Sequence, residues 1–182
     1  MTRQRIRCLA LVAIAIIAPR VRGQVVTPAP APPPVEDRGR VFHDSLLQQL
    51  AGDWTMTGAV KGKPVTYELR AGWVLQHTWF RLEMQDVADP PQYQAIVYIG
   101  YDGDSTRYVA HWIDVFGGRF SETLGYGKRE GNSLRFEFKY ADGPFLTSFI
   151  FDPASGSWRV EMKDLLADGS WRDFASYRLD HQ

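Results

Sequence analysis

The chain has 182 residues, a length that suits one domain of ordinary size better than two. Its 21 basic and 21 acidic residues balance, but residues 1–23 hold five arginines and no acid, so the remainder carries 16 bases against 21 acids. An acidic remainder argues against nucleic-acid binding, which needs a basic face. A single cysteine excludes a disulfide framework and a cysteine-based zinc site.

The N-terminus has the order of a secretory signal peptide. Basic residues 2–7 precede an apolar run at 8–18, and the polar, helix-breaking stretch 19–23 follows. The run of 11 residues is about half of the roughly 20 that a membrane-spanning helix needs, so no stable membrane insertion is expected after cleavage. We expect cleavage before Gln24 and export to the periplasm or the extracellular space.

Residues 24–40 are predicted to be a linker. Five prolines stand within residues 25–35, and proline fixes φ and removes a backbone donor, which favours an extended spacer. All six tryptophans lie beyond the linker. The chain therefore divides into a signal peptide at 1–23, a proline-rich linker at 24–40 and one domain at 41–182.

The domain begins with a short helix and continues as strands. Residues 41–50 space their apolar side chains as a helix does, with His43, Asp44 or Ser45 available as the cap. Polar and apolar residues then alternate, with turn residues about every 8–12 positions. The predicted strands are 53–60, 65–71, 73–84, 92–101, 106–115, 119–127, 133–140, 145–152, 158–166 and 171–180. This pattern predicts an all-β fold, an antiparallel up-and-down β-barrel of about ten strands with a short N-terminal helix.

Two stretches carry a resemblance to known barrels. LLQQLAGDW at 46–54 resembles the start of barrels of the calycin superfamily, in which a helical turn leads into Gly-x-Trp on the first strand. YIGYDGDSTRYVAHWIDVFGG at 98–118 resembles a family of uncharacterised bacterial exported proteins built as lipocalin-like barrels. The resemblance implies a barrel with a cavity, an exported protein and no particular reaction. It also implies a seam in which an arginine of the last strand, Arg178 or else Arg172, stacks on Trp54.

Ten strands also resemble the barrels of fatty-acid-binding proteins and nitrobindins. Nitrobindins bind haem through a histidine in a Pro-Leu-x-x-His-Leu type of segment near the C-terminus. This chain ends SYRLDHQ, with His181 outside any such segment, so we expect neither haem nor another cofactor.

The candidate site consists of polar and aromatic residues expected to face the barrel interior. Glu122 and Asp173 each stand between apolar residues that the alternation turns inward. An unpaired buried charge costs several kcal/mol, so such groups either form an internal network or orient a ligand. The predicted ligand-binding residues are His77, Trp79, Arg81, His111, Trp112, Glu122, Tyr126, Tyr140 and Asp173.

For two predicted strands the sequence does not decide which face points inward, because both of their faces are apolar. In strand 106–115 the inward set is either Tyr108, Trp112 and Asp114 or Arg107, His111 and Ile113. In strand 73–84, His77 and Arg81 come inward only if the neighbouring tryptophans do. For strand 119–127 we predict Phe120, Leu124 and Tyr126 inside. In the other strands the same alternation turns Tyr67, Leu134, Phe136, Phe138, Tyr140 and Tyr177 inward.

Three functions fit this architecture. We expect a binding protein that holds a small hydrophobic or amphipathic molecule in the barrel. The alternatives are a hydrolase or isomerase with Glu122 or Asp173 as its base, and a structural or interaction module with a filled barrel. The histidines and carboxylates have no local metal-ligand spacing, and no Gly-x-Ser-x-Gly motif is present, so no metal site and no catalytic residue is predicted.

Overall fold

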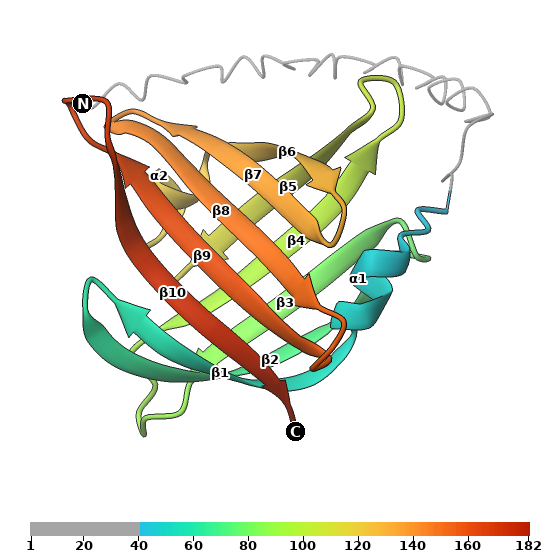
Figure 1. Ribbon diagram of the computed structural model, residues 1–182, viewed down its shortest axis with the longest axis horizontal. Coiled ribbons are helices and arrows are strands. Elements are labelled where there is room, and N and C mark those ends of the chain that lie inside the picture. The colour runs from blue at the N-terminus through green and yellow to red at the C-terminus, as the bar shows by residue number, and fades with distance from the viewer. Residues whose placement is uncertain (1–40) are drawn as a thin grey trace, which may run out of the picture. The chain divides into compact units, whose positions relative to one another are not determined.

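The computed structural model describes residues 41–182; the predicted signal peptide and linker lie outside the described residues. Helix α1 (Ser45–Leu50) precedes ten antiparallel strands, each paired with its neighbours in the chain, and the first strand pairs with the last to close a barrel (Figure 1). The strands are β1 (Gly52–Val60), β2 (Lys63–Val74), β3 (Trp79–Asp86), β4 (Gln94–Asp102), β5 (Arg107–Asp114), β6 (Leu124–Glu130), β7 (Ser133–Tyr140), β8 (Gly143–Asp152), β9 (Ser157–Leu165) and β10 (Trp171–His181). The predicted all-β barrel with its short helix is confirmed.

Helix α1 closes one end of the barrel. Its cap is Asp44, whose side chain accepts hydrogen bonds from the backbone amides of Leu46 and Leu47, as expected for an N-cap. Both leucines and Leu50 are buried, because the helix turns its apolar side toward the barrel interior. The interior itself is filled by bulky side chains from the strands, of which the largest fully buried ones are Trp54, Trp158, Phe80, Phe136 and Phe138.

Strand β2 runs through Gly72, where the sequence predicted a break. The chain reverses later, at residues 75–78, and β3 begins at Trp79. Leu75, Gln76 and His77 all have φ between 49° and 68°. This left-handed backbone is usually adopted by glycine or asparagine, which mark such turns in a sequence. Without such a residue, the sequence pattern could not place this turn.

Strand β6 turns glycines inward and large residues outward. Gly125 and Gly127 are buried, whereas Leu124 and Tyr126 are exposed. A Cβ atom at Gly125 would lie 2.5 Å from the Phe138 ring, so the glycine leaves the space that this ring fills. The predicted inward set of Phe120, Leu124 and Tyr126 is therefore wrong, and the first part of the predicted strand is helix α2 (Gly118–Ser121) instead.

The seam between β1 and β10 is closed by a histidine rather than an arginine. Trp54 is fully buried, and the His181 ring stacks on it at 3.7 Å between centroids. Arg178 alternates with the buried Tyr177 and Leu179, so it points outward and pairs with Asp180. Arg172 is likewise exposed and pairs with Asp164. The predicted arginine stack on Trp54 is wrong.

Candidate functional site

The two ends of the barrel differ in chemistry. At the helix end, α1 is held to the barrel, with the Trp158 Nε1 donating to the Gln49 carbonyl oxygen at 3.3 Å. The opposite end, which we call the tyrosine end, is formed by the loops at 87–93 and 115–123 and by the other hairpin turns of that side. Figure 1 shows α1 and α2 at opposite ends of the strands.

Polar side chains gather inside the barrel at the tyrosine end. The Tyr93 hydroxyl donates to Asp114 Oδ2 at 3.3 Å, and the Trp112 indole nitrogen donates to the Tyr93 oxygen at 3.1 Å. The Tyr67 ring lies 5.6 Å from that of Tyr93 and 5.9 Å from that of Tyr177. We call this group, with the inward residue at the end of β7, the tyrosine cluster: Tyr67, Tyr93, Trp112, Asp114, Tyr140 and Tyr177.

The hydroxyl groups of the tyrosine cluster stay protonated at neutral pH. Burial raises the pKa of Tyr93 and Tyr140, and the charge of Asp114 raises each of them further. Burial likewise raises the pKa of Tyr67 and Tyr177. The end of the barrel therefore presents phenol groups, together with the inward carboxyl group of Asp114, to any molecule that enters it.

The segment 115–123, which contains α2, lies beside the tyrosine cluster. The Asp114 amide donates to the Ser121 hydroxyl at 3.3 Å, and the Phe116 amide donates to Asp114 Oδ1 at 3.0 Å. These bonds place the Phe116 ring 5.8 Å from that of Tyr93. Phe116 and Phe120 are nevertheless 66% and 56% exposed, so apolar rings stand at the rim next to polar groups inside.

Two predicted site residues, Trp112 and Tyr140, belong to the tyrosine cluster. The structure thus selects the first alternative for strand β5, with Tyr108, Trp112 and Asp114 on the inner side. His111 lies on the other side of this strand, where its Nε2 is 2.6 Å from the Ser121 carbonyl oxygen. It holds the α2 segment rather than lining the interior.

The predicted residues of β3 and its preceding turn lie away from this cluster. Trp79 packs its ring on the outer face of the barrel, where a Cβ at Gly100 would lie 2.9 Å from it. Arg81 is on the same outer face and approaches Glu83 at 3.3 Å. His77 lies in the 75–78 turn at the helix end. The inward placement of Trp79 and Arg81 is therefore wrong, because Phe80 and Leu82 take the inward positions.

Three further predicted residues are exposed on the outside, which contradicts their inward placement. Glu122 is the C-cap residue that follows α2. The Arg107 guanidinium lies over the Tyr126 ring, with its Cζ atom 3.9 Å from the ring centroid. Asp173 approaches Lys163 at 3.1 Å. A β-bulge between Asp173 and Ala175 shifts the alternation of β10 by one residue, so Asp173 pairs with the outward Lys163 and faces outward instead of inward.

Sequence reasoning missed part of the cluster. Tyr67 and Tyr177 were expected to face inward but were not assigned to the site. Tyr93 was placed in the predicted strand 92–101, whereas it lies in the loop before β4. One signal was available. In an up-and-down barrel, alternate hairpin turns share an end, so inward tyrosines near the end of β7 and in the matching parts of β2 and β10 are expected to meet.

The family comparison covers nearly all of the barrel. A family model described as "Protein of unknown function (DUF1579)" matches residues 43–178. The chain belongs to this family. The match begins just before α1 and ends within β10, so the tyrosine cluster lies inside the DUF1579 region. Comparison with curated proteins gives no match.

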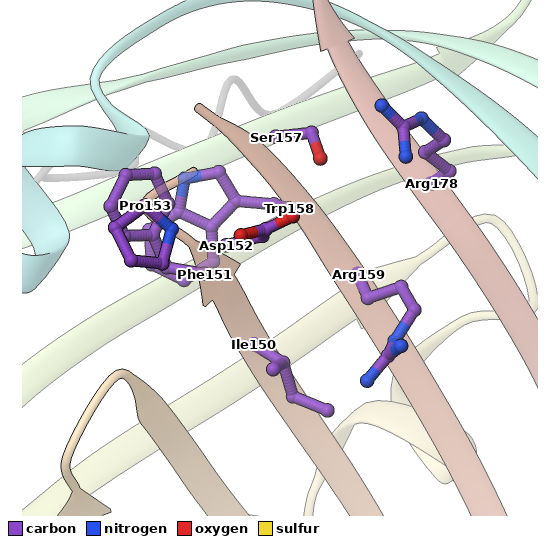
Figure 2. Close-up of a pocket in the computed structure, with 8 residues that line it drawn as sticks. All are labelled: Ile150, Phe151, Asp152, Pro153, Ser157, Trp158, Arg159 and Arg178. Carbon is purple, nitrogen blue, oxygen red and sulfur yellow. The ribbon is translucent and has the colours of Figure 1, made fainter. Parts of the chain in front are cut away.

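Two pockets of the DUF1579 domain lie at the helix end. One, of about 330 Å³, contains Arg178 and is shown in Figure 2, where Arg159 and Arg178 stand on neighbouring strands apart from the group of Phe151, Pro153 and Trp158. Arg159 approaches Glu161 at 3.1 Å and Arg178 approaches Asp180 at 2.9 Å, so each guanidinium group already has a carboxylate partner. The other pocket, of about 440 Å³, contains His77. Neither includes a residue of the tyrosine cluster, and the cavity inside the barrel stays a prediction.

Within residues 41–182, no three histidine, cysteine or acidic side chains stand close enough to hold a metal ion together. No helix in this part of the chain has the length and apolar character to cross a membrane.

Proposed function

We propose that this DUF1579 protein binds a small amphipathic molecule at the tyrosine end of its barrel. The observation that carries the proposal is the position of the tyrosine cluster, which places phenol hydroxyls, the Trp112 indole and the Asp114 carboxyl group inside an otherwise apolar barrel. A ligand's polar group would bind these donors and acceptors. Its apolar part would lie against Phe116 and Phe120, which are exposed at the rim.

Binding is favoured over catalysis by the way the polar residues are used. The two carboxylates considered as bases, Glu122 and Asp173, are exposed outside the barrel. The hydrogen bonds of His77 and His111 go to backbone carbonyl groups of Phe42 and Ser121. An acid–base mechanism needs a base within hydrogen-bonding reach of a substrate, usually beside a second oriented group. The inward carboxyl group of Asp114 is already bonded by the Tyr93 hydroxyl and the Phe116 amide.

The proposal is tested with N-phenyl-1-naphthylamine, a neutral amphiphile that fluoresces in apolar surroundings. The double variant Phe116→Ala/Phe120→Ala removes the exposed rings, and we expect it to bind the probe at least about fivefold more weakly, near 1 kcal/mol. Tyr93→Phe and Asp114→Asn test the polar part. The matched control is Leu75→Ala, which truncates a 68% exposed side chain at the helix end. Equal probe affinity in all of these proteins would contradict the proposal.

We further propose that the protein is exported, which the order of charge and hydropathy in residues 1–23 supports. N-terminal sequencing of the exported protein is expected to begin near Gln24. A soluble form that retains residues 1–18 would contradict export by cleavage.

We also infer kinship with the calycin superfamily. A short helix that closes one barrel end and leads into Gly-x-Trp on β1 supports it. The buried position of Trp54 at the start of the barrel agrees with this kinship, although His181 takes the place expected for an arginine.

A further inference from the structure

The pocket of about 440 Å³ at the helix end is large enough for a small molecule. Its volume lies within the range of roughly 300–1,000 Å³ that is usual for small-molecule sites. It is formed by the start of α1, the end of β2 with its turn, and the end of β6. The lining residues are His43, Asp44, Ser45, Gln48, Trp73, His77 and Arg129.

The carboxylate in this pocket is already occupied. Asp44 is only 7% exposed and accepts from the amides of Leu46 and Leu47 at 2.8 Å each. It also accepts from the Tyr108 hydroxyl, and Arg129 Nη1 lies 3.4 Å from both of its oxygens. A carboxylate has about four acceptor positions, so Asp44 offers none to a ligand. The first-turn amides are bound to it as well and take no part in the site.

The remaining groups of the pocket are mainly donors. Gln48 Oε1 accepts from the Trp73 indole nitrogen at 2.9 Å, which leaves the Gln48 amide nitrogen to donate. Arg129 uses Nη1 on Asp44 and Nε on the Gly131 carbonyl oxygen at 3.1 Å, and its Nη2 has no partner among the described residues. The pocket therefore lacks an acceptor for these N–H groups.

Two imidazole rings complete this set of donors. The ring centroids of His43 and His77 lie 5.2 Å apart, and His77 also stacks on Trp73 at 4.1 Å. His77 Nδ1 is 3.2 Å from the Phe42 carbonyl oxygen, which only accepts, so Nδ1 carries the proton. Nε2 of His77 and both ring nitrogens of His43 have no hydrogen-bond partner within residues 41–182, so they are available to a bound group.

We propose that this pocket binds a small organic carboxylate. Arg129 Nη2, the Gln48 amide and the rings of His43 and His77 bind the carboxylate, and Trp73 supplies an apolar wall for the rest of the molecule. A singly charged group fits because Asp44 already balances the charge of Arg129. The site lies at the opposite end from the tyrosine cluster and is independent of the proposed amphiphile binding.

The test compares three probes of similar size on the ¹⁵N-labelled protein by NMR. Benzoate is expected to cause saturable shifts in the amides of residues 45–48 and in the Trp73 indole signal. Benzamide, its neutral counterpart, is expected to bind at least about tenfold more weakly. Equal shifts from both probes, or the absence of saturable shifts, overturns the proposal. Tighter binding of phenyl phosphate overturns the assignment to a carboxylate.

Variants test whether the named side chains are responsible. His43→Phe/His77→Phe keeps both rings and removes their N–H groups, and we expect benzoate affinity to fall at least about fivefold. His181→Phe is the ring-for-ring control at the same end of the barrel. Arg129→Gln is a second test variant, which keeps the test valid if the double variant does not fold. Its control is Arg135→Gln, which removes an exposed guanidinium from β7. Unchanged affinity in both test variants overturns the proposal, whereas N-phenyl-1-naphthylamine binding reports separately on the tyrosine end.

Discussion

Asp44 is the residue that ties α1 to the barrel wall. Besides capping the helix, its carboxylate bonds Tyr108 of β5 and Arg129 of β6, three segments that are distant in sequence. The sequence identified Asp44 as one of three possible caps, because capping depends on local spacing. It could not show the two distant contacts, which arise only when the barrel closes.

We predict that Asp44→Ala lowers the free energy of unfolding by about 2–4 kcal/mol. The lost cap contributes about 1 kcal/mol, and the buried Tyr108 hydroxyl left without its acceptor adds about 1–3 kcal/mol. Urea unfolding of the variant measures the change. Asp180→Ala, which removes an exposed carboxylate paired with Arg178, is the control and is expected to cost less than about 1 kcal/mol. A similar loss in both variants would show that Asp44 has no special role.

A second important residue is Gly125, which has no side chain and so leaves room for the Phe138 ring. We predict that Gly125→Ala destabilises the protein by about 1–3 kcal/mol, since the added methyl group meets an aromatic ring that is packed on all sides. Thermal or urea unfolding measures it. Gly103→Ala is the matched control, because a Cβ there meets no atom within 4 Å. If the two variants unfold alike, the close approach of Phe138 is unimportant.

At the scale of the element, the positions of the strands were predictable, but the face that each strand turns inward was only partly so. Alternation along β7 identified Leu134, Phe136 and Phe138 as inward residues, and all three are buried. The prediction failed where one backbone feature broke the period: the bulge in β10, the inward glycines of β6 and the left-handed turn at 75–77. Such features change which face a residue occupies without changing the composition of the strand.

Three hairpin turns share one local device, in which an aspartate accepts a hydrogen bond from a following serine hydroxyl. The pairs are Asp102 with Ser105, Asp152 with Ser155 and Asp168 with Ser170. In each case the serine hydroxyl is the main cause that lowers the aspartate pKa below its usual value. These carboxylates stabilise the fold at pH values above their unfolded pKa, and that contribution is lost as the pH falls through the folded pKa.

We predict that Ser105→Ala raises the pKa of Asp102 toward its ordinary value. The hydroxyl that favours the charged form is removed, while the backbone amide of Ser105 and Arg107 remain. Carboxyl ¹³C chemical shifts followed against pH measure this directly. Asp152, in its own turn, is the internal control and should titrate as in the unmodified protein. An unchanged Asp102 titration would assign the lowered pKa to another group.

At the scale of the whole molecule, inward tyrosines stand at both ends of the barrel. Tyr108 bonds Asp44 at the helix end, and the other four belong to the tyrosine cluster. Burial is the main cause of the raised pKa of all five. Because all five are buried, ionisation of the tyrosines at either end of the barrel is expected to destabilise the fold.

We predict cooperative alkaline unfolding. A tyrosine whose folded pKa is raised contributes stability below its unfolded pKa of about 10, and the contribution is lost as the pH rises above that value. Ultraviolet titration is expected to show these five phenols ionising together with loss of the folded circular dichroism signal. Tyr108→Phe and Tyr177→Phe should each move the unfolding midpoint to higher pH, because each removes one buried group that ionises. Ionisation of all eight tyrosines in a protein that stays folded would contradict the prediction.

The candidate site was only partly predictable because it is assembled by closure. Tyr140 was identified from the alternation of β7, but the inward face of β5, with Trp112 and Asp114, was left open. Tyr93 lies in the loop before β4, and both of its hydrogen-bond partners come from β5. Pairing across the barrel, rather than any single stretch of sequence, decides which of these side chains meet.

The pairing of β1 with β10 also has a consequence for synthesis. Trp54 is in register with His181, so the final seam cannot form until nearly all of the domain has left the ribosome. Until then a nascent chain carries strands with two unpaired edges and uncovered aromatic faces, the features that promote aggregation. The protein is therefore most easily lost to aggregation before β10 is available to close the barrel. Chaperone binding to the growing chain, with release once β10 is available, would protect it during that time.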